Sequence, residues 1–343
     1  MKAWLLDRIV DLKKESTPLV WSDQAIPEPA PGQIRIKISC CGVCHTELDE
    51  IEGRTPPPEF PVIPGHQVVG RIDQLGQGCT EHQLDDRVGV AWIYSACGKC
   101  EQCRNGFENL CPWFQATGRD HHGGYAEYMV VPERFAYGIP DTFEDAEAAP
   151  LLCAGAIGYR SLSLTKLENG QVLGLTGFGA SGHLVLKMAR YQYPDSIILV
   201  FARSREEQQF ALSLGAHWVG KVTDTPPAQA NAIIDTTPVW SPVVESLLHL
   251  KPSGRLVINA IRKEADDQKA LLKLRYPDHL WMEKEIKTVA NITSSDVRAF
   301  LQLAARVPIK PNIQIYPFTR ANDALMDLKH RHLRGAKVLA WNA

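Results

Sequence analysis

QVLGLTGFGASGHLVLKMAR, residues 171–190, is the stretch that decides the fold of the second half of this chain. The apolar run before the turn is typical of a buried strand, and the run after it is typical of a helix. The turn between them is G-x-G-x-x-G, formed by Gly177, Phe178, Gly179, Ala180, Ser181 and Gly182. Its first glycine allows a tight bend, the second lets backbone N–H groups approach a pyrophosphate, and the third lets the helix pack on the strand. The order of strand, turn and helix therefore favours a dinucleotide-binding unit over an ordinary glycine turn.

From residue 171 onward, strand-like and helix-like runs alternate. The pattern predicts strands at 171–177, 196–202, 232–235, 255–260 and 285–290. It predicts helices at 183–192 and 205–216, and Gly215 suits the end of the second helix. Repeated βα units predict an α/β fold with a parallel, doubly wound sheet and right-handed crossovers.

The first 150 residues have a different character. They are rich in Pro, Gly and short β-type runs, which predicts an irregular, mostly β domain with strands at 33–39, 67–72 and 87–92. A helical stretch at 144–164 separates this region from the alternating one. The tail is mixed again, with a helix near 296–306 and a final strand at 333–341.

The residues after the second predicted strand bear on the choice of nucleotide. An NAD site usually has Asp or Glu about 20 residues beyond the glycine loop, to bind the ribose 2′-hydroxyl. Phe201 and Ala202 stand there instead, and neither side chain can accept a hydrogen bond. Arg203, Ser204 and Arg205 follow, and two guanidinium groups suit a 2′-phosphate. We therefore favour NADP, with NAD bound without the acid as the alternative.

Four cysteines lie close together in CGKCEQCRNGFENLC, residues 97–111. Cys97, Cys100, Cys103 and Cys111 can converge on one tetrahedral zinc ion at about 2.3 Å each. Two-residue spacings make poor disulfides, and nothing in the sequence marks secretion. Four thiolates fill the coordination shell, so this lobe, about residues 95–113, is predicted to hold a structural zinc rather than a catalytic one.

Three further potential ligands lie outside that lobe: Cys44, His66 and Cys153. Two thiolates and an imidazole with one open position make a catalytic zinc set, in which the ion can act as a Lewis acid. Taken singly, each residue has a plainer interpretation. A cysteine in an apolar run is often a packing residue, and a histidine after a glycine can cap a turn.

Composition limits the classes of function. The chain has 343 residues, a formal net charge of −2 and no block of like charges, which argues against nucleic-acid or membrane partners. The apolar run at the N-terminus is too short for a signal peptide, and no stretch approaches the roughly 20 residues of a membrane span. With nine cysteines, these features favour a cytoplasmic protein whose cysteines have metal or catalytic roles.

In order along the chain, the runs CGVCHTEL and PGH, the four-cysteine lobe, LLCAG and GFGASG resemble the zinc-dependent alcohol dehydrogenases of the medium-chain dehydrogenase/reductase family. The resemblance covers essentially the whole chain. It implies a GroES-like, mostly β catalytic domain at 1–153, a Rossmann nucleotide-binding domain at 154–290, and a return to the catalytic domain at 291–343. It also implies two zinc ions per chain, with the catalytic ion on the three ligands just named.

The resemblance also assigns roles to residues that lie close to Cys44 in the sequence. Thr46 matches the hydroxyl that hydrogen-bonds the substrate oxygen, Glu47 the carboxylate that orients the zinc-bound histidine, and His45 a residue near the cofactor pyrophosphate. Trp92 matches a residue that lines the substrate pocket. An alcohol would lose its proton through Thr46 and pass a hydride to the nicotinamide, and a carbonyl would be reduced by the reverse path.

Two residues depart from the family's pattern. Gln67 follows the zinc histidine where the family usually has Glu, and a neutral amide predicts slower exchange at the metal rather than loss of zinc. Asp49 stands where many relatives have a histidine that passes the proton to solvent. An exposed Asp is a weaker base than His at neutral pH. The proton would then leave by water, or the enzyme would work mainly as a reductase.

We therefore expect an NADP- or NAD-dependent alcohol dehydrogenase or aldehyde reductase that acts on a small molecule and forms a homo-oligomer, a tetramer or a dimer. A polyol dehydrogenase is one alternative, but such relatives commonly have a carboxylate where Cys153 stands. A diverged member with little turnover, serving as an NADP-binding sensor, is another, which Gln67 keeps open. Trp92, Trp113 and Phe114 favour an apolar or aromatic substrate.

Overall fold

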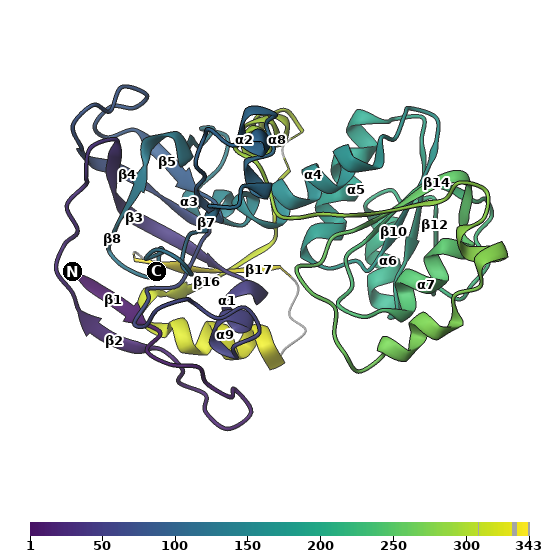
Figure 1. Cartoon of the computed structure of the whole chain (residues 1–343), viewed down its shortest axis with the longest axis horizontal. Coiled ribbons are helices and arrows are strands. Elements are labelled where there is room, and N and C mark those ends of the chain that lie inside the picture. The colour runs from purple at the N-terminus through teal and green to yellow at the C-terminus, as the bar shows by residue number, and fades with distance from the viewer. Residues whose placement is uncertain (308, 331–334, 342–343) are drawn as a thin grey trace. The chain divides into compact units, whose positions relative to one another are not determined.

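The chain folds into two units, the first of which is built from both ends of the sequence (Figure 1). Met1–Cys153 and Ile292–Ala343 form one unit, and Ala154–Asn291 forms the other. The computed structural model describes residues 1–307, 309–330 and 335–341. Within those ranges, every helix is too short or too polar to cross a membrane.

The unit Ala154–Asn291 is built around a parallel six-stranded sheet. Its strand order is β12-β11-β10-β13-β14-β15, so the chain starts in the middle of the sheet and winds outward in both directions. This doubly wound order is that of a Rossmann sheet and confirms the predicted α/β class. The strands are β10 (Val172–Thr176), β11 (Ile197–Phe201), β12 (Trp218–Gly220), β13 (Ala230–Asp235), β14 (Leu250–Ile258) and β15 (Glu285–Thr288).

Four helices accompany this sheet: α4 (Ala154–Thr165), α5 (Ala180–Gln192), α6 (Arg205–Ser213) and α7 (Ser241–Leu248). Helix α5 begins three residues earlier than predicted, because the glycine loop turns directly into helix. One core lies between the sheet and α7, where Val243 and Leu247 join Phe201 and Leu256. Neither β12 nor α7 is predicted from the sequence, since β12 spans only three residues and α7 only eight.

The other unit contains a seven-stranded sheet. Its order is β16-β17-β3-β4-β5-β9, and β8 also pairs with β3. Strand β3 buries Ile34, Ile36 and Ile38 at alternate positions, as a half-buried strand does. It runs four residues beyond the prediction and ends immediately before Cys44, so it places the first predicted zinc ligand at the end of a central strand. The strands are β3 (Gln33–Val43), β4 (Val68–Leu75), β5 (Arg87–Val90), β8 (Tyr128–Pro132), β9 (Ala136–Gly138), β16 (Ile313–Pro317) and β17 (Ala336–Ala340).

The C-terminal segment completes this second sheet. Strand β17 pairs antiparallel with the end of β3, and α9 packs against both α1 and β17. The final strand was predicted to begin at residue 333, and residues 333–334 lie outside the described residues. The remaining elements of the unit are β1 (Lys2–Leu5), β2 (Val20–Asp23), α1 (His45–Ile51), β6 (Ile93–Ser95), α2 (Glu101–Arg104), β7 (Gln115–Ala116), α3 (Asp145–Ala148), α8 (Ser294–Arg306) and α9 (Ala321–His330).

The helical stretch predicted at 144–164 is not one helix. Helix α3 passes into a 3₁₀ turn at Ala149–Leu152, and α4 begins only at Ala154. Between them Cys153 adopts a non-helical conformation with φ −122° and ψ −78°. This break is where the two units meet in sequence, and it carries the third predicted zinc ligand.

Candidate functional site

Three sequence-distant segments bring Cys44, His66 and Cys153 together. Cys44 caps the N-terminus of α1, His66 lies two residues before β4, and Cys153 occupies the break before α4. Their potential ligand atoms all lie within 4.8 Å of one another, and the two sulfur atoms are 3.9 Å apart. Two ligands at about 2.3 Å in a tetrahedral shell are separated by about 3.8 Å. The spacing of the two sulfur atoms therefore suits a shared zinc ion.

The imidazole of His66 supplies the test of whether a metal fits. Its Nε2 is buried and has no hydrogen-bond partner among the described residues. A buried polar atom without a partner is costly, and coordination of a metal ion is one way to satisfy it. Because this nitrogen lies beside two sulfur atoms, the donor set fits zinc in both type and number.

Glu47 holds His66 from the other side of the ring. Its Oε1 lies 2.6 Å from Nδ1 of His66, and its Oε2 accepts a 2.7 Å hydrogen bond from the backbone N–H of Cys44. Both side chains are almost completely buried. Although burial lowers the pKa of His66, the Glu47 carboxylate raises it well above its usual value. Burial in turn raises the pKa of Glu47 itself, against the opposing effect of His66.

The two cysteines of the set differ in their acidity. The hydrogen bond with Cys153 lowers the pKa of Cys44 well below its usual value, and the same bond raises the pKa of Cys153. The contact between the two sulfur atoms thus favours the ionised form of Cys44. A thiolate is the form that binds a metal.

Thr46 and His45 stand on the first turn of α1. The hydroxyl of Thr46 lies 3.6 Å from Sγ of Cys44, so it borders the ligand set. Thr46 is half-buried, whereas His45 is exposed. The Thr46 hydroxyl is thus a group beside the sulfur atom of Cys44 that can exchange a proton.

Asp49 is not the exposed acid that the sequence analysis expected. Its side chain is only 9% exposed, and its Oδ1 accepts a 2.5 Å hydrogen bond from Nε of Arg54. The turn that follows α1 folds Arg54 back, because the backbone carbonyl of Asp49 accepts the N–H groups of Arg54 and Thr55. Arg54 also pairs with Glu52, which contacts Lys329 of α9. Asp49 is thus part of an ion-pair network.

Glu50 is a buried acid that sequence reasoning missed. It is 1% exposed, and neither carboxyl oxygen has a hydrogen-bond partner among the described residues. Burial raises its pKa well above the usual value, and the charge of Glu47 adds to that effect. Both effects therefore disfavour the ionised form of Glu50. Its position in the run ELDEIEG gives no sign of burial, because charged residues flank it.

The four cysteines of the 97–111 run also converge. Their sulfur atoms lie within 4.8 Å of one another. Backbone N–H groups point at them, as in the hydrogen bonds from Cys100 to Cys97 (3.3 Å) and from Cys103 to Cys100 (3.4 Å). The N–H of Lys99 helps to lower the pKa of Cys97 to about 6. Such a ring of sulfur acceptors suits a tetrahedral metal with no open position, and Cys111 completes it.

The predicted nucleotide-binding residues lie at the ends of β10 and β11. Gly177 turns with φ +81°, Gly179 caps α5, and Gly182 is buried against the carbonyl of Gly177. Ala180 is exposed and Ser181 half-buried on the first turn of α5. The N-terminus of that helix therefore presents backbone N–H groups, which suit a phosphate.

Two arginines that follow β11 have side chains without polar contacts to the rest of the described structure. Arg203 and Arg205 are exposed, and neither side chain forms a hydrogen bond or ion pair with another described residue. Ser204 between them is occupied, since it caps α6 by accepting the N–H of Glu207 at 3.1 Å. Both guanidinium groups are thus free to meet an anionic ligand, whereas the serine is committed to the helix.

A pocket of about 750 Å³ opens in the unit that holds the metal ligands. Its lining mixes aromatic, basic and acidic groups, among them Trp113, Phe114, Arg119, His121, His122 and Glu59. Trp92 lies behind this lining: its ring packs on Phe114 at 5.2 Å, and Arg119 lies 5.5 Å over it. The pocket volume is in the range of small-molecule sites, which is about 300–1,000 Å³.

Comparison with known proteins gives consistent matches. Residues 30–141 match the alcohol dehydrogenase GroES-like domain family. The chain is 39% identical to "Probable alcohol dehydrogenase AdhA" of Mycobacterium tuberculosis, and the match covers 99% of this chain and 97% of that protein. It is 31% identical to an alcohol dehydrogenase of a Moraxella species, over 92% and 94% of the two chains. A solved cinnamyl alcohol dehydrogenase from Sorghum bicolor superposes with a TM-score of 0.85 at 26% identity, covering 99% of this chain and 97% of that one.

Proposed function

Since the chain belongs to the zinc-dependent alcohol dehydrogenases of the medium-chain dehydrogenase/reductase family, we propose that Cys44, His66 and Cys153 hold its catalytic zinc ion. The protein is an oxidoreductase that interconverts alcohols and their carbonyl compounds. The observation that carries the metal assignment is the unpartnered, buried Nε2 of His66 beside two sulfur atoms. The four-cysteine lobe would hold a second, structural zinc. A polyol dehydrogenase or a sensor without turnover is not favoured.

The residues around the ligand set have separate tasks in this proposal. When bound, zinc supplies Lewis-acid polarisation of a substrate oxygen. Glu47 fixes the ring of His66 through Nδ1, so that Nε2 faces the two sulfur atoms. Thr46 accepts the proton of an alcohol on Oγ1, or returns it to a carbonyl oxygen in the reverse direction.

The proton does not continue from Thr46 to Asp49. The carboxylate of Asp49 is engaged by the guanidinium of Arg54 and is nearly buried. We therefore propose that the Thr46 hydroxyl exchanges its proton with water.

We assign the unit Ala154–Asn291 as the nucleotide-binding domain, and NADP as its preferred cofactor. The free guanidinium groups of Arg203 and Arg205 support this choice, since they stand where NAD sites usually place an acid. Ser204 would contribute only through its backbone, because its hydroxyl caps α6. His45, exposed on α1, is assigned to the pyrophosphate side of the cofactor.

The pocket beside Trp92 is proposed to receive the part of the substrate remote from the reacting oxygen. Its rings of Trp113 and Phe114 suit a planar apolar body, and Arg119 and the two histidines suit polar substituents. This lining supports an aromatic alcohol or aldehyde over a short aliphatic one.

An exposed sheet edge supports a homo-oligomer. All four residues of the edge strand β15 are exposed. Five large apolar side chains in or near this strand in the sequence are also exposed: Leu272, Tyr276, Trp281, Met282 and Ile286. An open edge with apolar neighbours is a surface that proteins usually cover. We propose that a second copy of the chain pairs with this edge. We also propose a cytoplasmic location, because thiolate ligands require a reducing compartment.

One experiment tests the metal and the cofactor together. Zinc per chain is counted by elemental analysis, and the same sample is titrated with NADPH and NADH while alcohol oxidation and aldehyde reduction are assayed. Two zinc ions with turnover are expected. One zinc ion without turnover would contradict the assignment of Cys44, His66 and Cys153.

The cofactor preference has its own variant. Replacing Arg203 and Arg205 by alanine is expected to weaken NADPH binding about 10- to 100-fold, since hydrogen bonds to charged groups contribute about 1.5–3 kcal/mol each and these are exposed. NADH binding should be unchanged. Arg275→Ala, which removes another exposed arginine of the same unit, is the control. Equal loss for both nucleotides would refute the 2′-phosphate assignment.

A further inference from the structure

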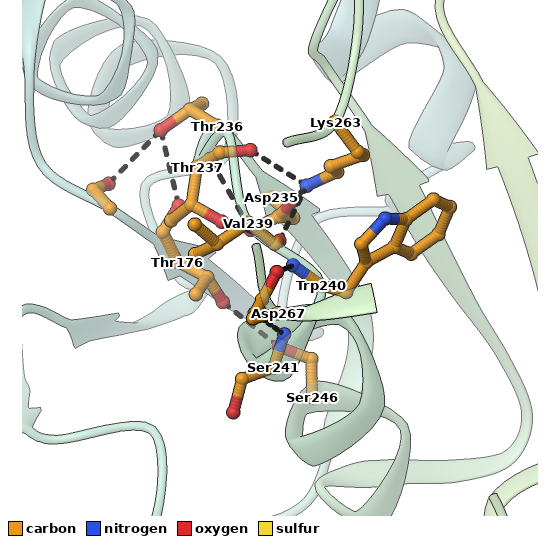
Figure 2. Close-up of polar contacts among 11 residues, drawn as sticks. Thr176, Asp235, Thr236, Thr237, Val239, Trp240, Ser241, Ser246, Lys263 and Asp267 are labelled. Carbon is orange, nitrogen blue, oxygen red and sulfur yellow. Dashed lines mark hydrogen bonds and ion pairs between the residues drawn. The ribbon is translucent and has the colours of Figure 1, made fainter. Parts of the chain in front are cut away.

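A buried lysine in the unit Ala154–Asn291 has no part in the proposed chemistry. Lys263 lies in the loop after β14, and its side chain is only 7% exposed. Figure 2 shows its ammonium group directed at three acceptors: the carboxylate of Asp235 and the carbonyl oxygens of Thr237 (2.6 Å) and Val239 (3.1 Å). An ammonium group has three N–H donors, so each can find a partner. A lysine is rarely buried unless it is paired in this way.

All three acceptors lie at the end of β13 or in the loop that follows it. Asp235 is the last residue of β13, and its side chain is completely buried. Its second oxygen accepts a 2.8 Å hydrogen bond from the hydroxyl of Thr237. Lys263 therefore fastens the loop after β14 to the loop after β13 and holds two carbonyl groups of the latter.

Two further contacts join the same loops. The N–H of Glu264 donates to the carbonyl of Pro238 at 2.7 Å. The carboxylate of Asp267 accepts the N–H groups of Trp240 (2.9 Å) and Ser241 (2.7 Å) at the start of α7 (Figure 2). The two loops thus form one polar network, in which Lys263 supplies the cation.

The loop that Lys263 holds lies against the glycine loop. Thr236 donates to the carbonyl of Thr176 through its N–H at 2.9 Å and through its hydroxyl at 3.1 Å. A Cβ atom on Gly177 would lie 2.8 Å from Oγ1 of Thr236 and 3.0 Å from Cγ2 of Thr237. Residues 236–237 therefore occupy the space beside the first glycine, and their position limits where the glycine loop can lie.

We propose that Lys263 is a positioning residue for dinucleotide binding. By holding the carbonyls of Thr237 and Val239, it keeps residues 236–237 against Gly177 and so keeps the glycine loop in the shape that receives a pyrophosphate. Both loops lie at the carboxyl ends of the strands, the edge at which open α/β sheets bind ligands. The inference rests on the proposed nucleotide-binding function of this unit.

The test is Lys263→Met in the full-length zinc-loaded enzyme, with the dissociation constants of NADPH and NADH measured by quenching of protein fluorescence. Both are expected to rise about tenfold, as residues that touch neither ligand can cause. The value of kcat at saturating cofactor and the zinc content should be unchanged. Lys284→Met is the matched control, because Lys284 likewise donates to two carbonyls of this unit, those of Leu247 (2.7 Å) and Asp278 (2.9 Å).

A second variant separates positioning from stability. Lys263→Met leaves Asp235 buried without its partner, so the variant can lose stability as well as affinity. The double variant Asp235→Asn/Lys263→Met removes the unpaired charge. It is expected to recover melting temperature but not cofactor affinity, since both carbonyls still lack their donor. It also replaces the single variant if that one does not fold.

The outcomes distinguish this inference from the function on which it rests. If the wild-type enzyme binds neither nucleotide, the nucleotide-binding assignment fails. If the wild-type enzyme binds and both Lys263 variants bind equally well, or if Lys284→Met weakens binding as much, the positioning role of Lys263 is overturned.

Discussion

Replacing Glu47 by glutamine tests the proposed catalytic zinc site most directly. Glu47 uses both carboxylate oxygens: Oε2 accepts the N–H of Cys44 at 2.7 Å, and Oε1 lies 2.6 Å from Nδ1 of His66. Glutamine has nearly the same shape, but it offers one oxygen and one NH₂ group. Whichever way the amide is turned, the NH₂ group faces an N–H donor.

The size of the effect follows from that mismatch. A buried donor that loses its acceptor costs about 1–3 kcal/mol, which corresponds to roughly 5- to 150-fold in a binding constant. If His66 loses its acceptor, the ring is no longer fixed with Nε2 toward the two sulfur atoms. If Cys44 loses it, the backbone beside the first ligand is disturbed. We therefore expect Glu47→Gln to weaken zinc binding about 10- to 100-fold, as loss of partners behind a metal ligand usually does.

The assay is competition for zinc with a chelating dye, with zinc per chain counted at each step. In Glu47→Gln one zinc ion should leave at a lower chelator concentration than in the wild-type enzyme, while the ion of the four-cysteine lobe stays. Glu50→Gln is the matched control: Glu50 lies on the same helix and is equally buried, but neither of its carboxyl oxygens has a hydrogen-bond partner among the described residues. An unchanged zinc affinity in Glu47→Gln, or an equal loss in Glu50→Gln, would refute the reasoning.

Three further predictions concern separate parts of the molecule. Thr46→Val should lower kcat by about 100-fold or more with zinc content unchanged, as loss of a proton-transferring group does, and Thr46→Ser should recover activity. Cys103→Ala should reduce zinc from two ions to one per chain and lower the melting temperature, because structural zinc contributes to folding; retention of both ions would contradict the lobe assignment. Burial lowers the pKa values of His121 and His183, so the unfolded chain binds more protons below about pH 6.5 and the free energy of unfolding should fall as the pH decreases toward 5. Urea unfolding at pH 7.0 and 5.5 measures this, and replacing both histidines by asparagine should reduce the difference.

Much of the fold follows from short-range sequence signals. The order of strand, glycine turn and helix at 171–190 predicts the start of the parallel sheet, because each element has its own periodicity and the glycines separate them. Cysteine spacing within 97–111 similarly predicts a cluster, since two-residue steps keep sulfur atoms close in any compact loop. Short elements such as β12 are not predicted, because three residues are too few to show a periodic pattern of apolar side chains.

Long-range pairing was harder to predict from the sequence. Lys263 and Asp235 are 28 residues apart, and nothing in either run distinguishes a buried ion pair from two solvated charges. Asp49 was expected to be exposed because acids usually are, yet a turn after α1 returns Arg54 to it. In both cases burial is decided by the tertiary structure around the charge.

Glu50 and Gln67 reflect the same constraint: only a few negative charges can be buried together near the metal ligands. Two thiolates and a neutral imidazole would balance the charge of a zinc ion, and Glu47 adds a carboxylate whose side chain is completely buried. Burial and the charge of Glu47 both raise the pKa of Glu50, so its ionisation is already disfavoured there. Gln67 is 4% exposed and packs so tightly on Gly42 that a Cβ there would come within 2.6 Å of its Oε1. A glutamate at residue 67 would place a third carboxyl group in this region, where no described arginine or lysine forms an ion pair with Glu47 or Glu50. The neutral amide at residue 67 is therefore the side chain that the surrounding acids can accommodate, and slower exchange at the metal is the expected consequence.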